Sequence, residues 1–274
     1  MTKTVALALG GGGARSLAQI AVLEALDELG IKPVALAGAS FGAVIAAAYA
    51  AGMTGKDIRR AVIAMAHDPG GTWSKLLAAR ASNLAAWLSA PLGNPLLLDA
   101  EKLCAQFLPP DIPDDFASLA IPLIVVATDL HARAEAALSS GPLKPALAAS
   151  IAIPGLVRPV AIGERLLVDG AVTNPLPFDL LRGLADVVIA VDSSVGPLAP
   201  GSVPDPWEAL GATIHVIAHG IITRKLADGG PDLLLRPNAG TFRLFEFFRA
   251  SAILRSAEPI KAEAKERIAA LLGV

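Results

Sequence analysis

The sequence predicts an α/β protein whose mostly parallel sheet forms the middle layer of a three-layer sandwich, with helices on both faces. Short runs rich in Val, Ile and Leu alternate with helical runs along the chain, which is the order of βαβ units. The short runs do not alternate with polar residues, as expected for strands that are covered on both sides. Both observations favour a doubly wound sheet.

The expected elements follow one another in this rhythm. A strand over 4–10 leads into an amphipathic helix over 15–30, and a strand over 33–40 leads into a second, buried helix over 42–52. The remaining predicted elements are a strand over 123–130, a helix over 143–153, a hairpin-like pair over 160–170, a strand over 185–192 and a helix over 213–225.

Two regions interrupt the pattern. Residues 68–115 contain Trp73, Trp87 and several Pro and Gly residues, and they predict a helical excursion from the sheet. Residues 196–212 are rich in Pro and Gly and predict a long surface loop. No repeat or clear linker marks a second domain, so residues 1–274 are expected to form a single domain.

Composition excludes several classes of function. The net charge is −2, so no basic field would attract nucleic acid. The single cysteine, Cys104, excludes an intramolecular disulfide and provides no metal-ligand spacing, and it is expected to be a buried small hydrophobic residue. Neither a metal nor another cofactor is predicted.

The stretch over 34–53 carries no charged side chain and is long enough to span a membrane. However, it contains three glycines and many alanines, and it divides into a strand-like half and a helical half. The N-terminal apolar run is short and is followed by glycines, which is typical of a strand and not of a signal peptide. We therefore expect a buried core segment in a cytoplasmic protein.

A glycine-rich turn over 10–16, GGGGARS, follows the first predicted strand. Such a turn at a helix N-terminus can bind an anion, either a dinucleotide pyrophosphate or the oxyanion of an acyl transfer, or it can simply be a tight turn. The dinucleotide motif requires a third glycine and an acidic residue about 20 residues further on. Here Ser16 and Ser40 occupy these positions, which disfavours a dinucleotide.

The pentapeptide GASFG, residues 38–42, has the G-x-S-x-G pattern of a nucleophile elbow. Small flanking residues allow the strand and the helix to approach closely at such a turn, which exposes the serine. Because the pattern lies between a predicted strand and a predicted helix, Ser40 is the expected nucleophile.

A serine nucleophile needs a base. His215 and His219 lie four residues apart on one helix face, but the α/β-hydrolase fold that uses such a histidine has several strands before its elbow, whereas Ser40 follows only the second. The remaining candidates each follow an apolar strand, and spacing alone does not distinguish them. They are Asp129, Asp169 and Asp192.

With these residues the sequence resembles the patatin-like phospholipase family, specifically its bacterial members. The glycine-rich LGGGGARS, the elbow GASFG and the DGA that begins at Asp169 occur in the order of the family. VVATDL, ASIAIPGLVRPV and DGAVTNPLP also resemble family blocks. The resemblance extends from about Val5 to Ser194 and is weaker in 232–250.

The resemblance implies a sandwich distinct from the α/β-hydrolase fold and a Ser–Asp dyad without histidine, in which Ser40 attacks an ester and Asp169 transfers the proton. The implied partners are acyl esters of phospholipids, lysophospholipids or neutral lipids, with transient membrane-surface contact and no calcium. The implied oxyanion hole consists of Gly11, Gly12, Gly13 and Arg15, and the implied motif glycines are Gly38, Gly42 and Gly170.

Two positions depart from the family pattern. Ser16 stands where the glycine loop usually ends in Gly, and it would be strained if that position required a positive φ. Gln19 replaces a His that is common in bacterial relatives. Ser16 therefore keeps open an alternative function, a catalytically silent protein on the same fold that binds a lipid or a partner.

Two segments outside the motifs are candidates for substrate contact. In 68–115, Trp73, Leu77 and Leu84 fall roughly on one helix face and predict either a lid or acyl-pocket wall, or a satellite helix. The segment 242–250, FRLFEFFRA, predicts an amphipathic helix that closes the core or an oligomer interface, or touches a lipid surface.

Overall fold

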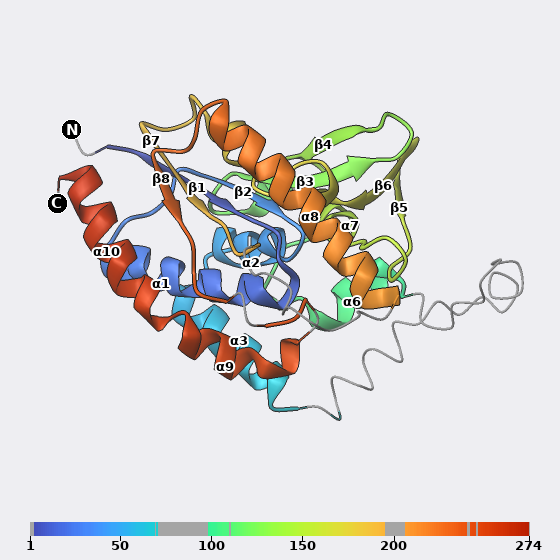
Figure 1. Cartoon of the computed structure of the whole chain (residues 1–274), viewed down its shortest axis with the longest axis horizontal. Coiled ribbons are helices and arrows are strands. Elements are labelled where there is room, and N and C mark those ends of the chain that lie inside the picture. Colours follow the sequence, from blue (N-terminus) through green and yellow to red (C-terminus); the bar gives the residue numbers. More distant parts are fainter. Residues whose placement is uncertain are drawn as a thin grey trace, which may run out of the picture.

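A single sheet forms the centre of the computed structural model (Figure 1), which describes residues 3–68, 70, 98–109, 111–194, 206–239, 242–244 and 246–273. Its strands in these residues are β1 Val5–Leu9, β2 Ala35–Ala39, β3 Leu123–Asp129, β4 Ala134–Leu138, β5 Val160–Ile162, β6 Arg165–Asp169, β7 Val187–Val191 and β8 Leu233–Leu235. The strand order is β5-β6-β3-β2-β1-β7-β8, and β4 pairs with β3. The strands from β3 to β8 in this order are parallel neighbours, and β4, β5 and β6 add antiparallel pairs at one end.

Helices cover both faces of this sheet (Figure 1). The α-helices are α1 Ile20–Glu28, α2 Phe41–Ala50, α3 Gly55–Ala66, α6 Ala100–Phe107, α7 Leu143–Ser150, α8 Pro206–Ala227, α9 Ala250–Ser256 and α10 Glu258–Leu272. Short 3₁₀ helices are η1 Gly13–Gln19, η2 Phe116–Ser118, η3 Gly170–Val172, η4 Phe178–Leu181 and η5 Phe247–Arg249. The predicted fold class, an α/β sandwich around a mostly parallel sheet, is confirmed.

The two faces of β1 pack into different cores. Val5, Leu7 and Leu9 point into the larger core, which contains α1, α2, α7, α9 and α10. Ala6 and Ala8 point to the opposite side, where they pack with η4 and with α8. Small side chains on that side allow the covering helices to lie close to the sheet.

The register of β3 brings the ends of two other strands together. Because β4 occupies one edge of β3, β2 and β6 both pair along its other edge. The parallel β2 ends with Ala39 opposite Val126, and the antiparallel β6 ends with Asp169 opposite Ala127. The carboxyl ends of β2 and β6 therefore meet at adjacent positions of β3, and this meeting point becomes the site described below.

The apolar stretch over 34–53 forms β2 and α2, which are largely buried, as expected. No helix in the described part of the chain combines the length and the apolar character that a membrane span requires. The stretch belongs to the core.

Several predicted elements have different limits in the structure. The helix expected over 15–30 begins as the 3₁₀ helix η1 and becomes α-helical only at Ile20. The loop expected over 196–212 is wrong for 206–212, because Pro206 begins α8; proline is favoured at the first helical position, where its missing N–H is not needed. The helix expected over 242–250 is also wrong, since among the described residues of this segment only η5 and the start of α9 are helical.

Most of the helical excursion expected over 68–115 falls outside the described residues, including Trp73, Leu77, Leu84 and Trp87. Within that region, α6 is helical and Asp99 caps it by accepting a hydrogen bond from the Lys102 N–H. In the segment 242–250, Phe242 is buried and the Phe247 ring lies 4.4 Å from the Phe41 ring, so this segment packs on the residue after Ser40.

Candidate active site

Ser40 occupies a sharp turn between β2 and α2. Its backbone has φ 52° and ψ −133°, and Ser40 and Arg133 are the non-glycine residues with positive φ among those described. A Cβ at Gly42 would lie 2.4 Å from the Gly10 carbonyl oxygen, and one at Gly38 would lie 2.5 Å from the Ala43 Cα. The positive φ of Ser40 and the close backbone contacts at the two glycines are typical of a nucleophile elbow.

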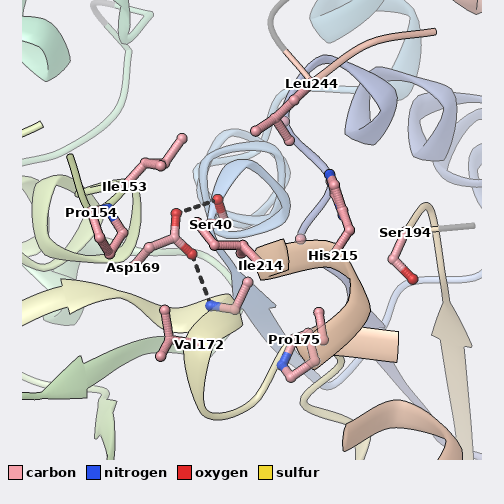
Figure 2. A pocket seen from close by; sticks show the side chains of 15 residues that line it. Ser40, Ile153, Pro154, Asp169, Val172, Pro175, Ser194, Ile214, His215 and Leu244 are labelled. Carbon is pink, nitrogen blue, oxygen red and sulfur yellow. Dashed lines mark hydrogen bonds between the residues drawn. The ribbon is translucent and has the colours of Figure 1, made fainter. Parts of the chain in front are cut away.

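Asp169 lies at the end of β6 with its carboxylate directed at Ser40 (Figure 2). The Ser40 hydroxyl donates a 2.7 Å hydrogen bond to Asp169 Oδ2, and the Ala171 N–H donates a 2.8 Å hydrogen bond to Oδ1. Thr128 supports the backbone behind it by donating from its hydroxyl to the Asp169 carbonyl oxygen. The structure thus brings together two predicted residues that are far apart in the sequence.

The Asp169 carboxyl group has an unusual acidity. Burial raises its pKa to about 6, although the hydrogen bonds from Ala171 and Ser40 act in the opposite direction by stabilising the charged form. A group with this pKa is mostly ionised at pH 7 and can still hold a proton transiently, which is the property required of a general base.

The glycine loop passes beside Ser40 and contributes backbone N–H groups. A Cβ at Gly11 would lie 3.2 Å from the Ser40 Cβ, so the loop touches the serine. The Gly11 N–H already donates to the Pro175 carbonyl oxygen, whereas the N–H groups of Gly12 and Gly13 have no acceptor among the described residues. Gly13 has φ 57°, and a Cβ there would overlap the Leu244 carbonyl oxygen.

Arg15 is buried, and its side chain contacts the His215 ring and not Ser40 or Asp169. Its Nη2 lies 3.0 Å from His215 Nδ1 and also contacts Nε2, and its Nε is 3.5 Å from the Gly12 carbonyl oxygen. Burial and the neighbouring guanidinium lower the pKa of His215 to about 4, so the ring is neutral and can accept a hydrogen bond at pH 7. Arg15 therefore links the glycine loop to α8.

Ser40 and Asp169 lie in a narrow pocket between the sheet and α8 (Figure 2). Its cavity is about 30 Å³, room for only about two water molecules. Among the residues that the structure describes, its wall is apolar or glycine backbone apart from Ser40, Asp169, Ser194 and His215. The other lining residues are Gly11, Gly12, Gly13, Ile153, Pro154, Ala171, Val172, Pro175, Ile214, Ala218 and Leu244.

The other candidate bases have different partners. Asp129 accepts hydrogen bonds from the N–H groups of His131 and Ala132 and so closes a turn. Asp192 accepts from Ser194 and pairs with Arg236 at 3.3 Å. On α8, His219 is exposed and does not line the pocket.

The structure also shows the surroundings of Cys104 and of Ser16 and Gln19, the two departures from the family pattern. Cys104 is buried, and burial raises the pKa of its thiol to about 12, which agrees with the expected inert packing role. Ser16 lies within η1 and is not one of the positive-φ residues, so it introduces no backbone strain. Gln19 donates to the Gly10 carbonyl oxygen at 2.6 Å and to the Ser193 hydroxyl at 2.8 Å, and thus holds the start of the glycine loop.

Sequence reasoning missed several residues of the site. Ser150 accepts a hydrogen bond from the Ser40 N–H, Pro175 holds the Gly11 N–H, and Leu244 and Ile214 line the pocket from the C-terminal third of the chain. Ser150 lies in ASIAIPGLVRPV, a block that resembles the family but whose residues the sequence alone gives no role. Pro175 lies in the family-like block DGAVTNPLP and Leu244 in the segment 242–250, a candidate for substrate contact, but neither signal gave the residue a role. Ile214 carries no local signal.

The fold and this arrangement of residues define a serine–aspartate site on an α/β sandwich. The family model of the patatin-like phospholipases matches residues 7–182. The chain therefore belongs to the patatin-like phospholipase family, whose members are in general lipid acyl hydrolases.

Named relatives support this membership. The NTE family protein Rv1063c of Mycobacterium tuberculosis is 37% identical over 203 residues, which is 74% of this chain and 52% of that protein. Rv2565 of the same organism is 32% identical over 259 residues, 92% of this chain and 40% of that protein. The patatin-like phospholipase domain-containing protein 7 of Rattus norvegicus is 31% identical over 191 residues, 69% of this chain and 13% of that protein. The chain thus spans about half the length, or less, of these relatives.

A solved structure supports the fold independently. The crystal structure of VipD from Legionella pneumophila superposes with a TM-score of 0.52 and 16% sequence identity, covering 97% of this chain and 67% of that one. At this level of identity the likeness concerns the fold.

Proposed function

We propose that the protein is a serine hydrolase of lipid acyl esters that uses a Ser40–Asp169 dyad. The single observation that carries this proposal is the 2.7 Å hydrogen bond from the Ser40 hydroxyl to a buried carboxylate whose pKa is about 6. A serine in a strained elbow with a base in direct contact meets the geometric requirement for an activated nucleophile.

In the proposed first half-reaction, Asp169 accepts the proton as Ser40 Oγ attacks the ester carbonyl carbon. The tetrahedral intermediate then collapses, the bond to the alcohol breaks, and Asp169 returns the proton to the leaving alkoxide. In the second half-reaction a water molecule gives a proton to Asp169 and attacks the acyl carbonyl carbon. The bond from that carbon to Ser40 Oγ then breaks, and Asp169 returns the proton to Ser40 as the fatty acid leaves.

The negative charge that develops on the carbonyl oxygen would be stabilised by the N–H groups of Gly12 and Gly13. These two groups line the pocket, and the described residues provide no acceptor for either. Gly11 and Arg15 have supporting roles in this proposal, because the Gly11 N–H is held by Pro175 and the Arg15 guanidinium contacts His215. Preorganised N–H donors of this type contribute about 10²–10³ in kcat.

The walls of the pocket support an ester with an apolar acyl group. Ile153, Pro154 and Val172 lie beside Asp169, and Leu244 lies across the pocket from them (Figure 2). Members of the family act on lipids, and an apolar wall favours the acyl part of a lipid over a charged substrate. Phospholipids, lysophospholipids and neutral lipids all present such an ester.

The test is the initial rate of hydrolysis of p-nitrophenyl esters of increasing chain length by the wild type, Ser40→Ala and Asp169→Asn. Both variants should lose at least about 10³-fold in kcat. Asp129→Asn is the matched control, since Asp129 is another buried aspartate at the end of a strand. The amide oxygen of the asparagine can still accept the hydrogen bonds from the N–H groups of the turn that follows. This variant should retain wild-type activity.

Two outcomes would overturn the dyad. Equal rates for the wild type and Ser40→Ala on every ester would favour the catalytically silent binding protein. A loss in His215→Ala as large as that in Asp169→Asn would make His215 the base. We expect His215→Ala to change kcat only a few-fold, because the ring faces Arg15.

A further inference from the structure

We propose that Ser150 is a positioning residue for the nucleophile, and that the segment 150–152 at the end of α7 sets the distance between Ser40 and Asp169. This inference rests on the proposed function and extends it to a residue that makes no contact with the reacting hydroxyl. The supporting observation is that residues 150–152 accept hydrogen bonds from the backbone of both Ser40 and Asp169.

Ser150 holds the backbone of the nucleophile. Its side chain is fully buried, and its Oγ accepts a 2.9 Å hydrogen bond from the Ser40 N–H. Among the described residues no backbone carbonyl accepts this N–H, because the elbow removes Ser40 from the sheet ladder. The Ser150 hydroxyl therefore satisfies a buried donor at the residue whose φ is strained.

The same segment holds the base. Ala152, two residues after Ser150, accepts a 3.1 Å hydrogen bond from the Asp169 N–H through its carbonyl oxygen. One rigid turn of chain thus binds the backbone of Ser40 at one point and the backbone of Asp169 at another. The 2.7 Å contact between the two side chains depends on both attachments.

The Val126 carbonyl oxygen fixes the position of Ser150 in turn. The Ser150 hydroxyl donates a 2.6 Å hydrogen bond to this oxygen, which leaves the lone pairs of Oγ available for the Ser40 N–H. Gly170 approaches the same carbonyl so closely that a Cβ at this position would lie 2.1 Å from the oxygen. Gly170, the residue after Asp169, therefore packs closely against the Val126 carbonyl group that accepts the hydrogen bond from Ser150.

These contacts predict a loss of reactivity when the Ser150 hydroxyl is removed. In Ser150→Ala the Ser40 N–H has no acceptor, and the elbow can relax away from its strained φ. A displacement of about 1 Å at the reacting atoms costs about 10²-fold in rate. We expect a fall of about 10- to 100-fold, with KM changed less than about two-fold, because Ser150 does not line the pocket.

The experiment measures the second-order rate of covalent modification of Ser40 by a fluorophosphonate, together with kcat and KM on a p-nitrophenyl ester, in the full chain. The variants are Ser150→Ala, Ser150→Thr, which retains a hydroxyl, and Ser256→Ala. Ser256→Ala is a matched control. The Ser256 hydroxyl also donates to a backbone carbonyl, Ile253 O at 2.7 Å, but Ser256 lies in α9 and has no contact with Ser40 or Asp169 among the described hydrogen bonds.

Support consists of slower modification and lower kcat in Ser150→Ala, recovery towards the wild type in Ser150→Thr, and wild-type rates in Ser256→Ala with a similar shift in Tm. The midpoint of the pH profile should not fall, because a weaker hydrogen bond from Ser40 can only raise the pKa of Asp169. If Ser150→Ala does not fold, the near-isosteric Ser150→Cys, a weaker acceptor, should show the same loss in smaller measure.

Wild-type modification and turnover rates in a folded Ser150→Ala, or in Ser150→Cys where the alanine variant is unfolded, would overturn the inference and leave the dyad intact. Failure of the proposed function looks different. In that case the wild type itself would not react with the fluorophosphonate faster than Ser40→Ala does, and both proposals would fall together.

Discussion

At the scale of single residues, Asp169 bears its charge where almost no solvent reaches it. The pKa of the folded-state carboxyl is raised to about 6 from the ordinary 3.8, mainly because of burial. A raised pKa means that the ionised form is less favourable in the folded state than in the unfolded chain. Ser40 adds to this cost, since a non-glycine residue in a sparsely populated backbone region costs about 1–3 kcal/mol.

Asp169→Asn should therefore increase the free energy of unfolding at neutral pH while it abolishes hydrolysis. Two pKa units correspond to about 3 kcal/mol, which is the largest gain expected. The cost of the charge is absent below about pH 4, where both states are protonated; it grows as the pH rises to about 6 and is constant above.

The measurement is urea unfolding of the wild type and of Asp169→Asn at pH 8 and at pH 4.5. The variant should be the more stable protein at pH 8, and its advantage should shrink at pH 4.5. An advantage of the same size at both values would show that the ionisation of Asp169 is not its source.

The same group predicts the pH dependence of the reaction. If Asp169 is the base, kcat/KM should be constant from about pH 7 to 8 and fall tenfold per pH unit below a midpoint near the pKa of about 6. The profile on a short-chain ester between pH 4.5 and 8.5 would measure it. A midpoint that moves in His215→Ala would point to the histidine instead.

At the scale of elements, the strand–helix units were predictable because their signals are local. Runs such as ADVVIAVD predict buried strands directly, and GASFG predicts the elbow from five consecutive residues. The predicted ends of the helices were wrong where the local helix propensity of the sequence and its tertiary surroundings favour different structures. The start of α8 lies in a Pro- and Gly-rich segment, and η1 replaces the first turns of an expected α-helix.

The choice among three aspartates illustrates what local sequence leaves open. Asp129, Asp169 and Asp192 all follow apolar strands, so spacing cannot separate them. Resemblance to a family favoured Asp169, and the physical reason is the register along β3. Only an antiparallel strand that ends opposite Ala127 meets the end of β2, and such long-range pairing is not encoded in either strand alone.

At the scale of the whole molecule, an ion-pair network ties the C-terminal helix to the first helix. Glu24 of α1 is almost fully buried and accepts two hydrogen bonds from Arg59 of α3, at 2.6 and 3.0 Å. Lys261 of α10 lies 3.3 Å from Glu24 and 2.6 Å from Glu28. Segments from the two ends of the chain are thereby held on one face of the sheet (Figure 1).

Glu24→Gln should lower the free energy of unfolding by about 2 kcal/mol, because it leaves two cations next to a neutral buried amide. This figure is below that for a fully buried pair, since Arg59 and Lys261 are partly exposed to solvent. Urea unfolding measures it. Glu263→Gln, which alters an exposed i,i+4 pair with Arg267 in α10, is the control and should change stability by less than about 0.5 kcal/mol.

Activity offers a second readout for the same variant. Neither Glu24 nor its partners line the pocket, so kcat and KM of Glu24→Gln should match those of the wild type at a temperature where it is folded. A large loss of kcat with unchanged stability would reveal a coupling between this network and the dyad.

The pocket is assembled from two parts of the chain, and the family model matches one of them. Ser40, Asp169 and the glycine loop lie within the residues that the family model matches, 7–182, whereas Ile214, His215, Ala218 and Leu244 lie beyond them. The residues proposed to carry out the chemistry thus lie within the matched region, and part of the wall that faces them lies outside it. Substitutions at Ile214, Ala218 or Leu244 would therefore change the wall of the pocket without altering any residue in the matched region.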